Sequence, residues 1–297
     1  MRILTLDVGG TAIKSAIVDE NNQLTDIRET PSESAGEALV YRAAEVAKSY
    51  ENYDVLSVSM TGQINNKTQN LLFQYNKNVD DEGEECPAGA ILKKAVNRPV
   101  FLMNDSNCAA LGEAYFGAGK GHKDFLCLTY GTGVGGGIIQ NGELLTGSRG
   151  IAGEVGHMVI HAGGRKCGCG RHGCYERYAA TTALLTSARK VRPELENARE
   201  LFALAEQDKA LQRVIRAWVR EIVEGLCTLV YIFNPDCIVL GGGVMEREDV
   251  LELVRKRFYK RVIPTFSKVE LLPAQLGNKA GMYGALAYAK QQMREME

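Results

Sequence analysis

The sequence predicts a duplicated α/β fold with two lobes, and three observations support this. The chain has 297 residues, which suggests two domains at the usual size of about 100–200 residues each. Short apolar runs typical of strands alternate with segments of helical spacing, as expected for α/β domains. An apolar run, a turn of glycine and threonine and a returning apolar run open the chain and recur from Phe125. We therefore expect two similar halves, residues 1–117 and 118–280.

In the first half, apolar runs punctuated by glycine and asparagine predict strands and a hairpin, and one segment has helical spacing. The expected elements are a strand at the start of the chain, the turn Gly9-Gly10, a strand Ile13–Val18, a hairpin tip at Asp19–Asn22, a helix over 34–50, strands Asp54–Met60 and Val100–Met103, and a helix Ser106–Phe116. Ser106 is the expected N-cap of that last helix, because a serine hydroxyl can accept from the first free backbone N–H groups.

The second half repeats the pattern and then becomes mostly helical. The expected elements are strands Phe125–Tyr130 and Val134–Gln140, a hairpin turn at Asn141-Gly142, helices within 179–233 with breaks near Pro193 and Asp208, strands Cys237–Leu240 and Val269–Leu272, and a closing helix Gly281–Met293. The Asn-Gly pair predicts a tight hairpin because both residues readily adopt positive φ.

The charge balance argues against a nucleic-acid binder. Thirty-five Lys and Arg residues face 36 Asp and Glu, for a net charge of -1, whereas binding to phosphates requires a basic face. No apolar run approaches the roughly 18 residues that span a bilayer. The segment before Asp7 is too short for a secretory signal. We expect a cytoplasmic protein with no nucleic-acid or membrane partner.

The eight cysteines fall into two groups. Five are scattered, and four of these lie among apolar residues, where cysteine acts as a small hydrophobe. These four are Cys108, Cys127, Cys227 and Cys237, and the fifth is Cys86. The other three are clustered among glycines at positions 167, 169 and 174.

The clustered cysteines predict a structural zinc site. Cys167, Cys169 and Cys174 supply three thiolates, and His157 lies ten residues before the first of them. Three cysteines and one histidine form a closed tetrahedral zinc shell, which has no open position for catalysis. On proximity alone, His161 and His172 are rival fourth ligands. A disulfide or unbound thiols are the alternatives to a zinc module over residues 157–176.

Carboxylates stand on both sides of the predicted zinc module and after one strand. Glu154 and Glu176 flank the module. Two carboxylates held in place beside one zinc module could accept hydrogen bonds from sugar hydroxyls. Solvated acids on a loop are the simpler alternative. Asn104-Asp105 follows the strand Val100–Met103, a position that suits a catalytic acid and a helix cap equally well.

Three glycine turns could contact a nucleotide. The first is Asp7, Gly9, Gly10 and Thr11, and the second is Gly131, Thr132 and Gly133. Glycine lets backbone N–H groups approach a phosphate, and Asp7 can hold Mg²⁺ through water. Neither turn matches a Walker A loop or a dinucleotide fingerprint. Each alone is explained more simply as a hairpin, but two at equivalent places suggest a phosphate chain held between domains. Gly241-Gly242 could admit adenosine or be a plain turn.

Taken together, these motifs resemble the ROK family of bacterial sugar kinases and sugar-responsive repressors over residues 3 to about 290. The matching segments are Asp7–Thr11, Asn104-Asp105, Gly131–Gly137, Glu154–His157, Cys167–Glu176 and Leu240–Gly243. The cysteine segment preceded by Glu-x-Gly-His is the most specific of them. The resemblance implies an actin-like ATPase fold, of the duplicated ribonuclease H-like type, with a cleft between two lobes and the helix 281–297 returning to the first lobe.

The resemblance also implies roles for individual residues. Asp105 would be the general base, and Gly62, Asn104, Glu154, His157 and Glu176 would bind the sugar, with His157 also a zinc ligand. Asp7, Gly9, Gly10, Thr11, Lys14, Gly131, Thr132, Gly133, Gly241 and Gly242 would bind Mg·ATP. Many members carry lysine directly after Gly-Gly-Thr, whereas here Ala12 takes that place and Lys14 follows on the same strand face. The loop 73–80, which helps to select the sugar, lacks the Pro-Asn and Gly-Trp pairs of glucokinases.

The leading hypothesis is therefore an ATP-dependent kinase that phosphorylates a free hexose or N-acetylhexosamine, with glucose and N-acetylmannosamine as first candidates. ATP, Mg²⁺ and a structural Zn²⁺ are the expected cofactors, and the resemblance implies a possible homodimer. The alternative is a non-catalytic, sugar-responsive regulator or sensor. A repressor needs a helix-turn-helix module, for which the sequence before Asp7 leaves no room.

Overall fold

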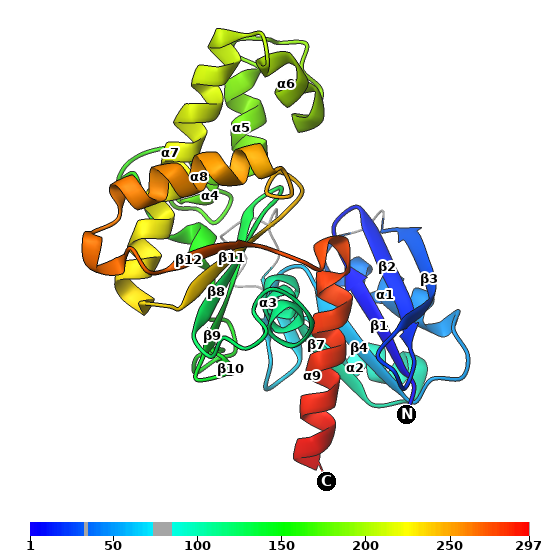
Figure 1. Ribbon diagram of the computed structural model, residues 1–297. Helices are drawn as coiled ribbons and strands as arrows, with labels where there is room; N and C mark the ends of the chain where they lie inside the picture. The colour runs from blue at the N-terminus through cyan, green and yellow to red at the C-terminus, as the bar shows by residue number, and fades with distance from the viewer. Residues whose placement is uncertain (33–34, 74–84, 297) are drawn as a thin grey trace. The chain divides into compact units, whose positions relative to one another are not determined.

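The computed structural model describes residues 1–32, 35–73 and 85–296. The described chain forms two compact units (Figure 1). Unit 1 comprises Met1–Gly121, Gly137–Gly153 and Asn278–Glu297, and unit 2 comprises His122–Gly136 and Glu154–Gly277. Among the described helices, none is long and apolar enough to cross a membrane.

A mixed five-stranded sheet forms the centre of unit 1. Its strands are β1 (Ile3–Val8), β2 (Ala12–Val18), β3 (Leu24–Pro31), β4 (Val55–Met60) and β7 (Val100–Asn104), in the order β3-β2-β1-β4-β7. Strand β1 pairs antiparallel with β2 and parallel with β4, which in turn pairs parallel with β7. The central strand β1 is therefore buried along nearly its whole length, and its carboxyl end carries Asp7.

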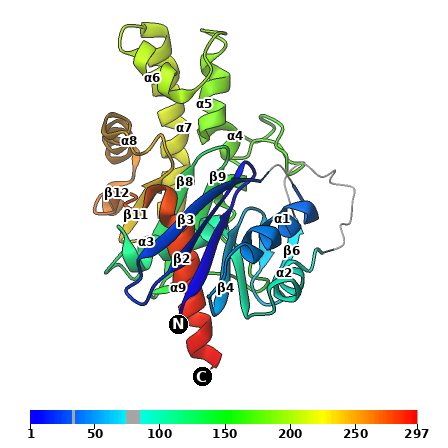
Figure 2. The same cartoon turned by 90° about the vertical axis from the view of Figure 1, so that its right-hand side faces the viewer.

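Alternation along β1 and β4 sends side chains to two different helical layers. Leu4, Leu6 and Val8 join a hydrophobic core with Leu39 and Val40 of α1 (Glu37–Lys48). Helix α2 (Ala88–Val96) packs beside α1, as Figure 2 shows. Residues of odd number face α9 (Ala280–Met296): Ser57 Oγ donates to the carbonyl of Ala285 at 2.7 Å. Because strand side chains alternate, Asp7 lies on the α9 face.

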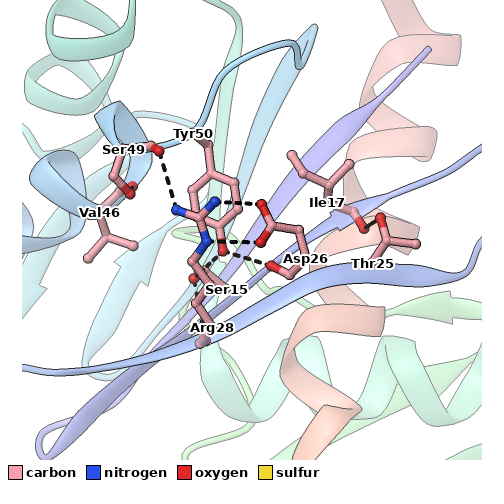
Figure 3. Close-up of polar contacts among 8 residues, drawn as sticks. All are labelled: Ser15, Ile17, Thr25, Asp26, Arg28, Val46, Ser49 and Tyr50. Atoms are coloured by element: carbon pink, nitrogen blue, oxygen red, sulfur yellow. Dashed lines mark hydrogen bonds and ion pairs between the residues drawn. The ribbon is translucent and has the colours of Figure 1, made fainter.

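Arg28 connects the edge strand β3 to the two residues that follow α1, Ser49 and Tyr50 (Figure 3). The Arg28 guanidinium lies 4.0 Å from the centre of the Tyr50 ring, forms an ion pair with Asp26 at 2.6 Å and donates to the carbonyl of Ser49. The Tyr50 hydroxyl contacts Ser15 Oγ at 2.9 Å and donates to the carbonyl of Asp26. These contacts hold a mostly exposed strand that has little apolar surface of its own to bury.

A hairpin and a helix of unit 1 lie next to residues that the sequence predicts to bind the sugar. The hairpin of β5 (Gln63–Asn65) and β6 (Asn70–Phe73) follows Gly62. Helix α3 (Asp105–Phe116) follows β7 without a loop and packs against α9. Gly284 permits this close packing, because a Cβ there would lie 1.7 Å from the carbonyl oxygen of Cys108.

A second five-stranded sheet has the order β10-β9-β8-β11-β12. Its strands are β8 (Phe125–Tyr130), β9 (Val134–Gln140), β10 (Glu143–Leu144), β11 (Cys237–Gly241) and β12 (Glu270–Pro273). Strand β11 pairs parallel with both β8 and β12. The boundary between the two units falls within β9, so Gly137–Gly153 belong to unit 1. Gly137 lies close to α3, since a Cβ there would lie 2.4 Å from that of Ala110.

The helices of unit 2 are organised around α7 (Lys209–Phe233). Its apolar stripe includes Leu211, Ile215, Trp218 and Ile222, at the spacing of one helix face. The helices α4 (Glu176–Ala179), α5 (Thr181–Ala188), α6 (Ala198–Ala205) and α8 (Glu248–Arg261) pack against it, although α6 and α8 contact it at different places along its length (Figure 1). Three short 3₁₀ helices, Val155–His157, Pro264–Phe266 and Gly277–Lys279, complete the described elements.

The predicted duplicated α/β fold is confirmed, including the hairpin turn at Asn141-Gly142, where both residues have positive φ. The breaks near Pro193 and Asp208 are also confirmed, and Asp208 caps α7. The prediction that Ser106 caps the helix after β7 was wrong. Asn104 is the cap, and its Oδ1 accepts from the N–H groups of Ser106 and Asn107. Strands β3, β5 and β6 and helices α2 and α8 were not predicted.

Candidate functional site

Unit 2 brings together the three clustered cysteines and His157. One ligand atom from each of the four residues lies within 4.8 Å of the other three. Cys169 Sγ lies 3.6 Å from Cys174 Sγ, and Cys167 Sγ lies 3.8 Å from His157 Nδ1. A tetrahedral zinc ion with Zn–S bonds of about 2.3 Å requires ligand separations of about 3.8 Å. The donor set and its spacing therefore fit a structural zinc ion.

The rival interpretations of this cluster fit the geometry less well. The distance of 3.6 Å between Cys169 and Cys174 is far longer than a disulfide bond of about 2.05 Å. His161 is engaged elsewhere, because its Nε2 lies 2.7 Å from Glu221 Oε2 and its ring packs on Tyr178. His172 forms a backbone bridge with Lys166 and lies outside the cluster.

Glycine turns hold the cysteine loop in place. The N–H of Cys167 donates to the carbonyl of Arg171 at 2.8 Å, and Cys174 pairs with Val159 in an isolated bridge. Gly173 has a φ of 84°, and a Cβ there would lie 1.7 Å from the carbonyl oxygen of His161. No other residue fits that position without moving the backbone, since positive φ and close approach both favour glycine.

The two predicted sugar-binding carboxylates of unit 2 flank the cluster. Glu154 Oε2 lies 3.9 Å from His157 Nε2, and Glu176 Oε1 lies 3.1 Å from Cys167 Sγ. Burial raises the pKa of the Cys167 and Cys174 thiols, and a bound divalent cation would offset this by stabilising the thiolates. Glu154, His157 and Glu176 thus lie together at the cysteine cluster.

The turn Gly131-Thr132-Gly133 connects β8 to β9 and lies beside Glu176. The N–H of Gly131 donates to the carbonyl of Gly133 at 3.0 Å, which closes the turn. A Cβ at Gly133 would lie 2.7 Å from Glu176 Oε2. The expected phosphate turn and one expected sugar carboxylate are therefore in direct contact within unit 2.

Gly241 is the last residue of β11, beside the end of β8, and Gly242 follows it. Gly241 is paired in register with Thr129. Gly242 has a φ of 96°, and a Cβ there would lie 2.2 Å from the carbonyl oxygen of Tyr130. Because the carboxyl ends of parallel strands meet at one edge of a sheet, the turns at 131–133 and 241–242 are neighbours.

Unit 1 carries the first glycine turn and a buried carboxylate. Ser59 Oγ donates to Asp7 Oδ1 at 2.8 Å, and the N–H of Gly9 donates to the carbonyl of Ala12 at 3.0 Å. Burial raises the pKa of Asp7, opposed by the hydrogen bond from Ser59 and by the charge of Lys14, which is its cross-strand partner. A cation would relieve the desolvation of this carboxylate, which suits a Mg²⁺ site.

The residues Gly62, Asn104 and Asp105 lie together in unit 1. Asn104 Nδ2 donates to the carbonyl of Gly62 at 2.9 Å and to Asp105 Oδ1 at 3.0 Å. The N–H of Ser106 also donates to Asp105 Oδ1, at 2.8 Å. Position 104 is thus a helix cap, and position 105 is the first residue of α3 with its carboxylate orientated by two donors.

Sequence reasoning missed several residues that support these sets. Ser59 gives no signal beyond being polar in an apolar strand, and Gly281 resembles an ordinary helix residue. A Cβ at Gly281 would lie 2.4 Å from Asp7 Oδ1, so this glycine makes room for the carboxylate. Tyr130 and Tyr175 directly adjoin predicted site residues, but the sequence gives neither a role of its own. The predicted loop 73–80 lies outside the described residues except for Phe73.

Each unit therefore gathers its own set of predicted residues. Unit 1 contains Asp7, Gly9, Gly10, Thr11, Lys14, Gly62, Asn104 and Asp105. Unit 2 contains Gly131, Thr132, Gly133, Glu154, His157, Cys167, Cys169, Cys174, Glu176, Gly241 and Gly242. Each set has a glycine turn that follows a buried strand and at least one carboxylate beside it.

Comparison with known proteins gives consistent matches over nearly the full length of the chain. A model of the ROK family matches residues 3–292. A glucokinase of Streptomyces coelicolor is 33% identical over 310 aligned positions, which cover 96% of each chain. An N-acetylmannosamine kinase of Haemophilus influenzae is 32% identical and covers 98% of this chain and 96% of its own.

A solved structure agrees with these sequence relatives. It is the crystal structure of a ROK family glucokinase from Streptomyces griseus in complex with glucose and AMPPNP, whose sequence is 32% identical to that of this chain. It superposes with a TM-score of 0.86 over 98% of this chain and 100% of its own. The similarity thus extends through both units and includes the elements that carry the two residue sets.

Proposed function

The chain belongs to the ROK family, and on this premise we propose that it is an ATP-dependent kinase that phosphorylates the 6-hydroxyl of a free hexose or N-acetylhexosamine. Its fold is the actin-like ATPase fold of ROK sugar kinases. Relatives named glucokinase and N-acetylmannosamine kinase align over nearly the whole chain. The observation that carries the proposal is the orientated carboxylate of Asp105 at the start of α3.

Asp105 is the general base in this proposal. A sugar hydroxyl is too weak an acid to be ionised before reaction, so a carboxylate must accept its proton as the bond to phosphorus forms. The donors Asn104 Nδ2 and Ser106 N–H hold one carboxylate oxygen, which fixes the plane of the group. In a loose phosphoryl-transfer transition state, most acceleration comes from such alignment and from charge neutralisation.

The nucleotide is assigned to the glycine turns. Backbone N–H groups of Gly9, Gly10 and Thr11 and of Gly131–Gly133 would bind phosphates, and Gly241-Gly242 would admit adenosine. Asp7 would hold Mg²⁺ through water, and Lys14, opposite Asp7 on β2, would contact a phosphate. When bound, Mg²⁺ neutralises phosphate charge.

The sugar hydroxyls are assigned to Gly62, Asn104, Glu154, His157 and Glu176. Zinc, held by His157, Cys167, Cys169 and Cys174, would supply a rigid support and no chemistry of its own, since its four positions are filled by protein. Carboxylates accept hydrogen bonds from hydroxyls, and their fixed positions reduce the entropy lost when the sugar binds.

A panel of sugars tests this function directly. ADP release is measured with purified protein, Mg·ATP and each of glucose, mannose, N-acetylglucosamine and N-acetylmannosamine. We expect at least one sugar to stimulate ADP release, with a sugar 6-phosphate as the product in mass and NMR analysis. If no sugar stimulates ATP consumption, the kinase proposal fails, and sugar binding without turnover would indicate a sensor.

A homodimer is part of the same proposal, because the family resemblance implies one. Light scattering coupled to size-exclusion chromatography tests it: a mass near twice 32.5 kDa is expected, and a mass near that of a single chain would contradict it.

A further inference from the structure

A buried hydrogen bond joins Tyr130 to Tyr175 in unit 2, and neither residue belongs to the proposed catalytic or binding sets. The two hydroxyl oxygens are 2.8 Å apart, and the rings meet edge to face with their centroids 6.3 Å apart. Both side chains are completely buried. Tyr130 is the last residue of β8, directly before the turn at Gly131, and Tyr175 lies between Cys174 and Glu176.

The direction of this hydrogen bond follows from the third partner. The Tyr175 hydroxyl donates to the carbonyl of Ile222 in α7 at 2.8 Å. A tyrosine hydroxyl carries a single proton, so Tyr130 must be the donor to Tyr175. The chain of donors therefore runs from Tyr130 through Tyr175 to the α7 backbone, and both hydroxyl protons are satisfied.

The fold makes space for Tyr175 at a specific place. Gly225 lies within the long helix α7, and a Cβ there would lie 2.3 Å from Cζ of the Tyr175 ring. Glycine is unfavourable inside a helix, so its presence at the contact indicates that the ring position matters. The backbone N–H of Tyr175 also donates to the carbonyl of Met158 at 2.7 Å, next to His157.

Three further contacts tie the phosphate turn to the segment that contains Tyr175. Thr181 forms two of these hydrogen bonds. Its N–H donates to the carbonyl of Gly131 at 3.0 Å, and its Oγ1 donates to the carbonyl of Tyr130, just before the turn, at 3.2 Å. Thr182 Oγ1 donates to the carbonyl of Thr132 at 2.7 Å. Residues 130–133 and 174–182 thus form one connected body, with the Tyr130–Tyr175 bond at its buried end.

We propose that Tyr130 and Tyr175 are positioning residues that couple nucleotide binding at the 131–133 turn to sugar binding at Glu176. This inference rests on the proposed function. A sugar bound at Glu176 restricts the adjacent Tyr175, and the hydrogen bond passes this restriction to Tyr130 and hence to Gly131. Close packing transmits such displacements instead of absorbing them. Each ligand then binds more tightly when the other is present, by the same factor.

The test measures this factor. Titration calorimetry gives the Kd of AMPPNP with and without saturating sugar, the sugar being glucose or N-acetylmannosamine, whichever stimulates ADP release more. In the wild type we expect sugar to tighten AMPPNP binding at least about 5-fold, the lower end of usual coupling. Tyr130→Phe removes only the donor and leaves the Tyr175–Ile222 bond, and we expect its coupling factor to fall to within about 2-fold of unity.

Two other variants separate coupling from general stability. Tyr53→Phe removes a buried tyrosine hydroxyl of unit 1, which donates to the carbonyl of Ala47, and is expected to keep the wild-type coupling factor. Thr182→Val removes the hydrogen bond from the exposed Thr182 to the carbonyl of Thr132. We expect this variant to have a smaller coupling factor, and it tests the inference even if Tyr130→Phe does not fold. A loss of stability alone would not alter the ratio of two affinities measured on folded protein.

The outcomes distinguish this inference from the proposed function. If the wild type binds neither sugar nor AMPPNP, the proposed function fails and the inference fails with it. If the wild type binds both but shows no coupling, or if Tyr130→Phe and Thr182→Val retain wild-type coupling, the inference alone is overturned.

Discussion

The carboxylate of Asp105 lies at the start of α3, next to the residue that caps this helix. It begins α3, where negative charge is favourable, and its orientation is fixed by donors from Asn104 and Ser106. The cap itself is Asn104, so the carboxylate of residue 105 is not needed to satisfy the first backbone N–H groups of the helix. Capping and the proposed catalytic role therefore fall to two neighbouring residues, Asn104 and Asp105.

This division predicts the effect of Asp105→Asn. The amide keeps the shape of the side chain but cannot accept the proton from the sugar, so we expect kcat to fall by about 10²–10⁴-fold. Sugar affinity should remain within a few-fold, because the other residues proposed to bind the sugar hydroxyls are unchanged. Steady-state kinetics and titration with sugar measure the two quantities. The exposed Asp249→Asn serves as the control, and near-normal turnover in Asp105→Asn would contradict the assignment.

The cysteine cluster gives a second prediction at the residue scale. We expect metal analysis to find about one zinc per chain, since four ligands form one closed site. Cys169→Ser removes one ligand, and we expect it to lose zinc and to weaken sugar binding by at least about 10-fold, as loss of support at a metal site commonly does. Cys86→Ser, outside the cluster, should retain both. Full sugar affinity in zinc-free protein would rule out the supporting role.

At the scale of elements, Gly225 in α7 should reverse the usual effect of glycine. Replacement of glycine by alanine within a helix ordinarily stabilises a protein by about 0.5–1 kcal/mol. Here the new Cβ would lie 2.3 Å from the Tyr175 ring, so we expect Gly225→Ala to lower the free energy of unfolding by about 1–3 kcal/mol through overpacking.

Unfolding in urea measures this effect. Ala217→Gly, in the same helix, reports the ordinary difference between the two residue types. In the double variant Gly225→Ala/Tyr175→Leu, the smaller side chain should recover part of the loss. A stabilised Gly225→Ala variant would show that the ring is free to move.

Two of the elements that the sequence did not predict, β3 and α8, were missed for different reasons. Strand β3 lies at a sheet edge and is mostly exposed, so it has no alternation of buried and exposed residues. Helix α8 does have a stripe of Val250, Leu251, Val254 and Phe258, but charged residues dominate its composition. By contrast, strands that end in glycine turns were predicted well, because burial and turn chemistry coincide in them.

The residues that the sequence singled out and those that it missed differ in how distinctive their chemistry is. The three clustered cysteines stand out from their spacing, whereas the structure is what selects His157 over His161 and His172 as the neighbouring histidine. Ser59, Tyr130, Tyr175 and Gly281 act through contacts between segments far apart in the sequence. A serine in a strand or a glycine in a helix has many ordinary explanations, so only the three-dimensional structure reveals these contacts.

At the scale of the whole molecule, the two units share one plan that the sequence repeat reflects. In each, a buried strand ends in a glycine turn and pairs in parallel with another strand, β1 with β4 and β8 with β11. Each unit also buries tyrosine hydroxyls, Tyr288 in unit 1 and Tyr130 and Tyr175 in unit 2. The stability of the whole chain should therefore respond to alkaline pH.

Tyr288 gives the clearest case for this pH dependence. Burial raises its pKa from 10.0 to about 12, opposed by the hydrogen bond with Gln69. The phenol of the unfolded chain loses its proton near pH 10, whereas the folded one keeps it until about pH 12. The unfolded state thus binds fewer protons in this window, and the free energy of unfolding falls as pH rises, by about 2–3 kcal/mol for this group.

The variant Tyr288→Phe isolates this contribution from those of other groups that titrate at high pH. Below pH 9, the free energies of unfolding of the wild type and the variant should differ by a constant amount, because the phenol is neutral in both states. Between pH 10 and 12 the wild type should lose stability faster, so the variant gains relative to it. Urea unfolding followed through Trp218 fluorescence at a series of pH values measures this difference. Parallel curves up to pH 12 would show that the Tyr288 phenol ionises equally easily in the folded and unfolded chains.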